Sequence, residues 1–269
     1  MKILVTGHKG FIGKNLFNKL VLDEDNIVKG IEDDIFDKLE WREYLISFLK
    51  DFIPDVIFHV GACSDTMEQN VNYMMIRNYE FTKIISEWSY VENKKFIYSS
   101  SAAIYGENGK YPSNLYGWSK YVGEDISFIN GGVNLRYFNV YGPGEEHKGK
   151  MASVVYQMYL KYKNNEEVKL FPGRPKRDFV YIDDVVDANI FALRNFDILH
   201  DRFYEVGSGE SRLFEDMLDI MNIPYTYHNE NMIPSGYQFE TKSSLFMNDW
   251  SPKFNIENGL KKYKEYLEK

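Results

Sequence analysis

A glycine turn after the first apolar run constrains the fold of this chain more than any other feature. Residues 2–6 read KILVT, and Gly7, Gly10 and Gly13 follow in a G-x-x-G-x-x-G spacing. Apolar residues then recur at helical spacing, at Phe11, Ile12, Leu16 and Leu20. Such a strand–turn–helix brings backbone N–H groups and the positive end of a helix dipole close to a pyrophosphate. By analogy with the G-x-G-x-x-G motif, the turn predicts dinucleotide binding by Gly7, Gly10, Phe11, Ile12 and Gly13.

Apolar runs alternate with helical stretches through the first half of the chain. The runs stand at 27–31, 55–60, 94–99 and 133–138, with helical patterns at about 39–51, 70–92 and 116–130. Strands that alternate with helices form βαβ units, which build a parallel sheet. Residues 1–150 are therefore predicted to form a dinucleotide-binding domain of Rossmann type, with a doubly wound parallel sheet.

The regular alternation of apolar runs and helical stretches changes after residue 150. A helical segment, MASVVYQMYLKY, is followed by the short runs EVKLF, DFVYI and FYEVG, with helices between and after them. This α/β pattern predicts a smaller substrate-binding lobe in residues 151–269. The lobe is expected to be interleaved with the sheet, because part of residues 175–210 returns to the first domain.

Charge and cysteine content exclude several classes of protein. The chain of 269 residues has a formal net charge of −8, which argues against nucleic-acid and membrane-surface binding. No apolar stretch approaches the roughly 20 residues of a membrane span, and glycines stand where a signal peptide needs an apolar run. The one cysteine has no metal-ligand spacing with the histidines: Cys63, His8, His59, His147, His200 and His228. We therefore expect a cytoplasmic protein that binds no metal.

An acidic segment, GIEDDIFD, follows the second apolar run. Glu32 or Asp33 is placed to bond a ribose hydroxyl and to repel a 2′-phosphate, which favours NAD over NADP. NADP stays open because Lys29 and Lys38 are close in sequence, and the acidic cluster is equally compatible with a solvated loop. Two residues of the same segment are candidates to flank the adenine: Asp34 and Ile35.

A tyrosine and a lysine lie one helical turn apart in SNLYGWSKYVGED. Tyr116 and Lys120 would share one face of a helix, about 6 Å apart, and Ser101 precedes them at the end of a predicted strand. The Tyr-x-x-x-Lys spacing alone is common by chance.

In this order, after the glycine turn, the three motifs resemble the extended short-chain dehydrogenase/reductase superfamily. Several segments resemble, almost one by one, the ADP-heptose 6-epimerases of the NAD-dependent epimerase/dehydratase family: HVGACSDT, YMMIRNYEFTK, SSSAAIYG, YGWSK, RYFNVYGPGEEHKGKMASV and KRDFVYIDDV.

The resemblance implies an enzyme that acts on a nucleotide-diphosphate sugar. A tightly bound NAD or NADP would take hydride from the sugar and return it to the other face of the transient carbonyl. We also expect a homo-oligomer. The implied catalytic residues are Ser101, Tyr116, Lys120 and Lys148, and the implied cofactor contacts include Gly61, Ala62 and Asn78. The implied substrate contacts are Ser101, Asn139, Lys148, Phe171, Gly173, Arg174, Arg177 and Tyr237.

The sequence also departs from that family on the substrate side. Lys150 stands where the family has a serine, Gln157 stands where it has a histidine, and the loop before Tyr116 is shorter. The sugar, the nucleotide and the epimerised carbon therefore stay open. The two arginines, Arg174 and Arg177, are suited to a diphosphate because guanidinium groups bind phosphate oxygens in pairs.

Proton chemistry explains why a lysine would accompany the tyrosine. A free phenol, with a pKa of about 10, is a weak base at neutral pH, and a nearby ammonium favours its phenolate form. Ser101 would hold the sugar oxygen. A 4,6-dehydratase would carry acidic residues where Ala102 and Ala103 stand. A one-base 4-epimerase, an NADPH-consuming reductase and a nicotinamide-binding sensor without turnover remain alternatives.

Overall fold

The computed structural model describes residues 1–107, 109–229 and 238–269. Its centre is a six-stranded sheet in which every pair of neighbouring strands is parallel. In spatial order the strands are β10 (Arg202–Val206), β5 (Val133–Tyr137), β4 (Lys95–Ser101), β3 (Val56–His59), β1 (Lys2–Thr6) and β2 (Ile27–Ile31). The predicted doubly wound parallel sheet is confirmed.

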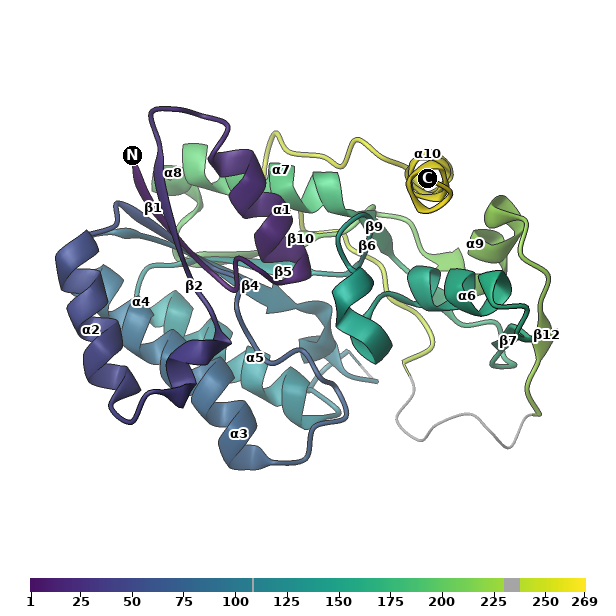
Figure 1. Cartoon of the computed structure of the whole chain (residues 1–269), viewed down its shortest axis with the longest axis horizontal. Coiled ribbons are helices and arrows are strands. Elements are labelled where there is room, and N and C mark those ends of the chain that lie inside the picture. The colour runs from purple at the N-terminus through teal and green to yellow at the C-terminus, as the bar shows by residue number, and fades with distance from the viewer. Residues whose placement is uncertain (108, 230–237) are drawn as a thin grey trace.

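Helices cover both faces of the sheet (Figure 1). One face carries α1 (Phe11–Leu20), α7 (Ile182–Arg194) and α8 (Phe196–Leu199). The other carries α2 (Trp41–Phe52), α3 (Val71–Met75), α4 (Phe81–Val91) and α5 (Leu115–Ile129). Successive side chains of a strand point to opposite faces, so Ile3 and Val5 of β1 pack toward α1 whereas Leu4 packs toward α2. Both faces are buried, which is why the strands read as continuous apolar runs.

Most of the second half of the chain, apart from α7, α8 and β10, builds a smaller lobe beside the carboxyl ends of the strands (Figure 1). Its helices are α6 (Val154–Lys163), α9 (Phe214–Met221) and α10 (Ile256–Leu267). Within the described part of the lobe, the strands form three short pairs: β6 (Asn139–Tyr141) with β9 (Phe179–Tyr181), β7 (Lys169–Leu170) with β12 (Thr226–Tyr227), and β8 (Lys176–Arg177) with β11 (Arg212–Leu213). The apolar core under α1 and α7 continues without a break into this lobe.

Two helices differ from the sequence prediction at the edge of the site. The expected helix over 70–92 is interrupted by a π-helical turn, Ile76–Glu80, between α3 and α4. The expected helix over MASVVYQMYLKY begins only at Val154, where the Ser153 hydroxyl accepts a hydrogen bond from the Tyr156 N–H at 3.2 Å. The residues before it form a 3-10 segment, Glu146–Met151, which is kinked at Gly149, where φ is 53° and ψ is −121°.

Candidate active site

A cavity of about 700 Å³ opens at the carboxyl ends of the parallel strands. This is where ligands bind in open α/β sheets. Many of the predicted site residues line it together: Gly7, Gly10, Phe11, Ile12, Gly13, Glu32, Asp33, Gly61, Ala62, Ser101, Tyr116, Lys120, Asn139 and Lys148. Cys63 lines it as well. Segments that are far apart in the sequence thus meet around one space.

The glycine turn is packed so tightly that side chains would not fit. Gly7 has a φ of +66°, and a Cβ placed on it would lie 2.6 Å from the Cα of Gly61. A Cβ on Gly13 would lie 2.0 Å from the carbonyl oxygen of Gly7. The bare backbone at the start of α1 therefore stays open to the cavity, which fits a pyrophosphate held by helix N–H groups. These residues fit a nicotinamide dinucleotide.

Replacing Gly13 with alanine should abolish retention of the dinucleotide, because the new Cβ displaces the Gly7 backbone. We expect at least a tenfold loss of affinity in calorimetric titration with NAD and a lower melting temperature. Gly10→Ala is the matched control, since its Cβ would lie 3.2 Å from the same oxygen and should be tolerated better. Equal losses in the two variants would contradict this account of the turn.

At the acidic end of the cavity, the two carboxylates are held by a backbone amide and by two nitrogen-bearing side chains. The Glu32 carboxylate accepts a hydrogen bond from the Lys9 N–H and lies 2.9 Å from His8 Nδ1. Asp33 accepts a 2.9 Å hydrogen bond from the Nε of Arg77. Arg77 lines the cavity from the π-helical turn and was missed by sequence reasoning, although an arginine inside the apolar stretch YMMIRNY was a usable signal.

Three predicted cofactor contacts do not line this cavity. Ile35 is only 2% exposed and packs in the core beneath the sheet, and Asp34 is exposed to solvent. Asn78 is buried, and its side chain bonds both backbone groups of Cys63, at 2.7 Å to the N–H and 2.9 Å to the carbonyl. Asn78 therefore shapes the wall of the cavity by fixing the segment that follows β3.

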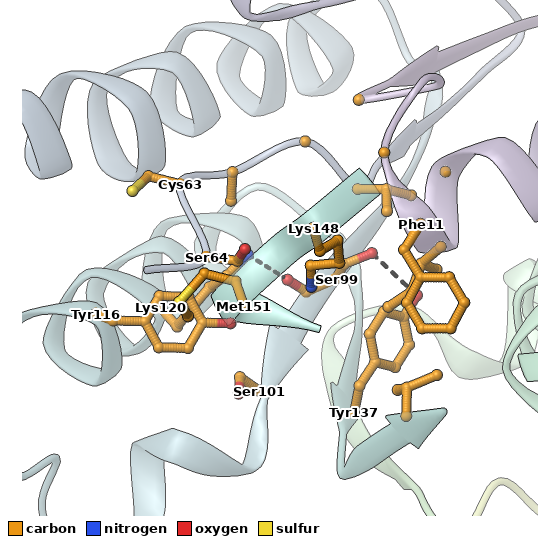
Figure 2. A pocket seen from close by; sticks show the side chains of 18 of the residues that line it. Phe11, Cys63, Ser64, Ser99, Ser101, Tyr116, Lys120, Tyr137, Lys148 and Met151 are labelled. Atoms are coloured by element: carbon orange, nitrogen blue, oxygen red, sulfur yellow. Dashed lines mark hydrogen bonds between the residues drawn. The ribbon is translucent and has the colours of Figure 1, made fainter. Parts of the chain in front are cut away.

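Tyr116, Lys120 and Ser101 meet as the motif predicts (Figure 2). Helix α5 begins at Leu115 because the Asn114 side chain caps it, accepting from the Gly117 N–H at 2.8 Å. Its first turns then aim Tyr116 and Lys120 into the cavity. Ser101 ends β4, and its hydroxyl accepts from the Ala103 N–H at 3.1 Å.

Burial shifts the pKa of both the tyrosine and the lysine of this motif. Burial raises the pKa of Tyr116, a rise opposed by a hydrogen bond with the Ser101 side chain. The Lys120 ammonium donates instead to the carbonyl of Ser99 at 2.8 Å, and burial lowers the pKa of Lys120 to about 7. In the protein alone Lys120 is not among the groups that shift the pKa of Tyr116. The expectation that Lys120, together with the positive ring of the cofactor, favours the phenolate stays a prediction for the cofactor-bound protein.

Lys148 reaches the same cavity from the 3-10 segment before α6 (Figure 2). Its ammonium lies 5.9 Å from the centre of the Phe11 ring. Burial lowers the pKa of Lys148, and the negative charge of Glu145 raises it in part. The neighbouring Lys150 is exposed and does not line the cavity.

The other predicted substrate contacts lie outside the cavity, in the lobe. The Phe171 ring packs 5.5 Å from the ring of His228, and Gly173 lies near the Phe239 ring. Arg174 is 3.6 Å from Glu215, whereas Arg177 is 9% exposed and donates to the Lys176 carbonyl at 2.8 Å. Tyr237 lies outside the described residues. Among the described residues that were predicted to contact the substrate but to take no catalytic role, only Asn139 lines the cavity.

Comparison with known proteins places this geometry among epimerases. Residues 3–207 match the NAD dependent epimerase/dehydratase family. The chain is similar to ADP-L-glycero-D-manno-heptose-6-epimerase of Brachyspira hyodysenteriae, with 35% identity over 99% of this chain and 98% of that protein. It is 38% identical to the enzyme of the same name from Cupriavidus pinatubonensis, over 81% of this chain and 76% of that one.

Two solved structures of epimerases are similar to this chain over almost its whole length. The crystal structure of Helicobacter pylori ADP-L-glycero-D-manno-heptose-6-epimerase matches with a TM-score of 0.85 and 29% identity, covering 99% of this chain and 96% of that one. UDP-glucose 4-epimerase of Thermotoga maritima, solved with UDP-glucose, matches with a TM-score of 0.83 and 27% identity, covering 100% and 99%. The similarity therefore extends through the lobe as well as the sheet.

Proposed function

This chain belongs to the NAD dependent epimerase/dehydratase family, and we propose from that premise that it inverts carbon 6 of an ADP-activated heptose. It is an NAD-dependent nucleotide-sugar epimerase, as its relatives support. The choice of ADP-heptose rests on the names of the two relatives that are 35% and 38% identical to it.

One observation carries the proposal: Tyr116 and Lys148 lie in one cavity with the glycine turn. Gly7, Gly10 and Gly13 would hold the pyrophosphate of NAD, with Glu32 at the ribose. When bound, the positively charged nicotinamide ring supplies reversible acceptance of a hydride and favours a nearby phenolate. The chain itself supplies the groups that move protons and hold the sugar.

Tyr116 would take the proton of the reacting sugar hydroxyl. Ser101, already hydrogen-bonded with the phenol, would hold the sugar oxygen beside it. Lys120 has a pKa of about 7, so near neutral pH it exchanges protons readily, and its bond to Ser99 fixes its position. A buried phenol whose pKa is raised makes a strong base once it is deprotonated.

Lys148 would serve the opposite face of the carbonyl. Epimerisation requires the sugar carbon to turn over between the two hydride transfers, so its oxygen then points elsewhere. Where one fixed phenol does not reach both positions, a second proton carrier removes that constraint. A lysine whose pKa is lowered by burial is suited to this task, since it gives and accepts protons closer to neutral pH.

The purified protein should carry nicotinamide nucleotide that is not consumed during turnover, because an epimerase returns its cofactor unchanged. Denaturation followed by an assay of the supernatant measures the cofactor, and NMR of an incubated ADP-heptose measures inversion at carbon 6. Stoichiometric consumption of added NADPH would instead identify a reductase.

A second candidate, a one-base 4-epimerase, is favoured by the 0.83 TM-score to the UDP-glucose enzyme. Incubation with UDP-glucose under the same conditions separates the two functions. Inversion at carbon 4 of UDP-glucose, with no change in ADP-heptose, would select this alternative.

Assembly and location stay predictions. No helix among residues 1–107, 109–229 and 238–269 is long and apolar enough to cross a membrane. The expected homo-oligomer is checked by light scattering of the eluting protein, and the cytoplasmic location by fractionation of cells.

A further inference from the structure

We propose that Glu145 is a positioning residue, which fixes the loop that carries Lys148 and supplies the counter-charge for that lysine. The proposal rests on the role proposed for Lys148 above. Glu145 is 0% exposed. It lies only three residues before Lys148, which lines the cavity. A fully buried carboxylate is costly unless its oxygens are satisfied, so its placement calls for a reason.

The Glu145 carboxylate holds both ends of the Lys148 loop. One oxygen accepts from the Gly142 N–H at 3.2 Å, and the Ser153 hydroxyl donates to the same oxygen at 2.8 Å. The other oxygen accepts from the Ser153 N–H. The Glu145 carbonyl meanwhile accepts from the Lys148 N–H at 3.0 Å. Residues 146–152 are therefore closed into a loop by the residue that precedes them.

A fourth donor ties this loop to the far end of the chain. The hydroxyl of Tyr263, in α10, donates to the Glu145 carboxylate at 2.9 Å and is itself fully buried. The loop thus rests on a helix that belongs to the lobe core, and the position of Lys148 depends on how α10 packs. This link joins the proposed proton carrier to the core of the smaller lobe.

None of the four donors is a cation, which separates Glu145 from an ordinary ion pair. A neutral amide would satisfy most of these donors at a lower desolvation cost. Holding the loop by hydrogen bonds therefore does not by itself require a charged side chain. Burial raises the pKa of Glu145, and the bonds from Ser153, Gly142 and Tyr263 oppose that rise. The charge has a use at Lys148, which lies one turn along the 3-10 segment that Glu145 precedes and whose N–H bonds the Glu145 carbonyl. There the negative charge opposes the effect of burial on the ammonium.

Other titratable groups near Lys148 do not take this role. Two carboxylates line the cavity, but Glu32 is paired with His8 and Asp33 with Arg77, and neither shifts the pKa of Lys148. The other titratable groups across the cavity are not carboxylates: Cys63, Tyr73, Tyr116, Lys120 and Tyr137. On the Lys148 loop itself, His147 and Lys150 bring no negative charge, and Glu146 is exposed to solvent. Glu146 therefore provides a matched control: an adjacent carboxylate whose charge is screened by water.

The test is Glu145→Gln, which keeps the shape and removes the charge. The amide oxygen replaces the acceptor for the Ser153 N–H, and the Ser153 and Tyr263 hydroxyls can turn to accept from the amide nitrogen. Only the 3.2 Å hydrogen bond from the Gly142 N–H loses its acceptor. Competitive acetylation across a pH series, read by mass spectrometry of the Lys148 peptide, gives the pKa of that lysine. We expect it to fall by roughly one pH unit. The pH dependence of kcat should move to lower pH by the same amount, with KM for the sugar nearly unchanged.

Two further variants separate the effect of the Glu145 charge from the effect of its hydrogen bonds to the loop. Glu146→Gln should shift the Lys148 pKa by much less, and an equal shift would overturn the assignment to Glu145. Glu145→Asp keeps the charge but has a shorter side chain, which bonds the loop less well. We therefore expect kcat to fall while the Lys148 pKa stays near that of the wild type. A wild-type kcat in Glu145→Asp would overturn the positioning role, even if Glu145→Gln does not fold. Acetylation needs no turnover, so failure of the proposed function, seen as normal epimerisation by Lys148→Met, is distinguishable from failure of this inference.

Discussion

Replacing Tyr116 with phenylalanine should lower kcat for epimerisation by about 10² to 10⁴, the usual loss when a general acid–base is removed. Affinity for NAD should change little, because the variant removes one hydroxyl and keeps the ring that lines the cavity. Lys120 retains its bond to the Ser99 carbonyl, so the helix start is expected to stay in place. NMR of the sugar measures the rate, and retention of the cofactor after gel filtration measures binding.

The matched control is Tyr137→Phe. Tyr137 lines the same cavity, but its hydroxyl is already bonded to Ser99 at 2.9 Å and to Asn189 at 3.0 Å. Loss of that hydroxyl should lower stability more than kcat. Turnover near the wild-type rate in Tyr116→Phe would remove Tyr116 from the mechanism and leave the cavity without its main base.

Lys148→Met should block epimerisation while a bound cofactor is retained. Methionine keeps the length and apolar stem of the side chain against Phe11 but cannot carry a proton. The expected loss in kcat is again about 10² to 10⁴. Lys150→Met is the control, because Lys150 is exposed and lies outside the cavity.

An aldehyde analogue of the sugar tests the two faces separately. Redox at one face should survive in one of the two variants, Tyr116→Phe or Lys148→Met, since each would remove the proton carrier for only one face. Epimerisation of the true substrate by Lys148→Met at the wild-type rate would refute the two-base scheme and favour a one-base 4-epimerase.

The features that the sequence predicts well are local or periodic. The glycine turn is set by three residues that must approach backbone closely, as Gly13 approaches the Gly7 carbonyl. The buried strands are recognisable in the sequence as apolar runs, because helices cover both faces of the sheet. Strand β6, by contrast, has three residues and exists because β9 returns to pair with it from a distant part of the chain. No local pattern signals such a pair.

The electrostatics of the site were harder to predict than its residues. The Tyr-x-x-x-Lys spacing identifies Tyr116 and Lys120 but not the carbonyl of Ser99, which takes the lysine's hydrogen bond. Arg77 and Asn78 occupy a π-helical turn, whose i→i+5 bonding departs from that of an α-helix, and there Arg77 bonds Asp33 and Asn78 bonds Cys63. Helical periodicity assumes a constant turn, so it misses side chains that an irregular turn aims into a site.

The late position of β10 in the chain bears on how the protein is made. Strand β5 is wholly buried between β4 and β10, but its partner is not synthesised until Arg202–Val206. During translation β5 is therefore an open sheet edge with apolar side chains, the kind of edge that pairs with other chains. The segment between them must loop out before the sheet closes, which favours slow completion and a need for chaperones. A chain cut short before residue 202 is expected to aggregate rather than to form a smaller active domain.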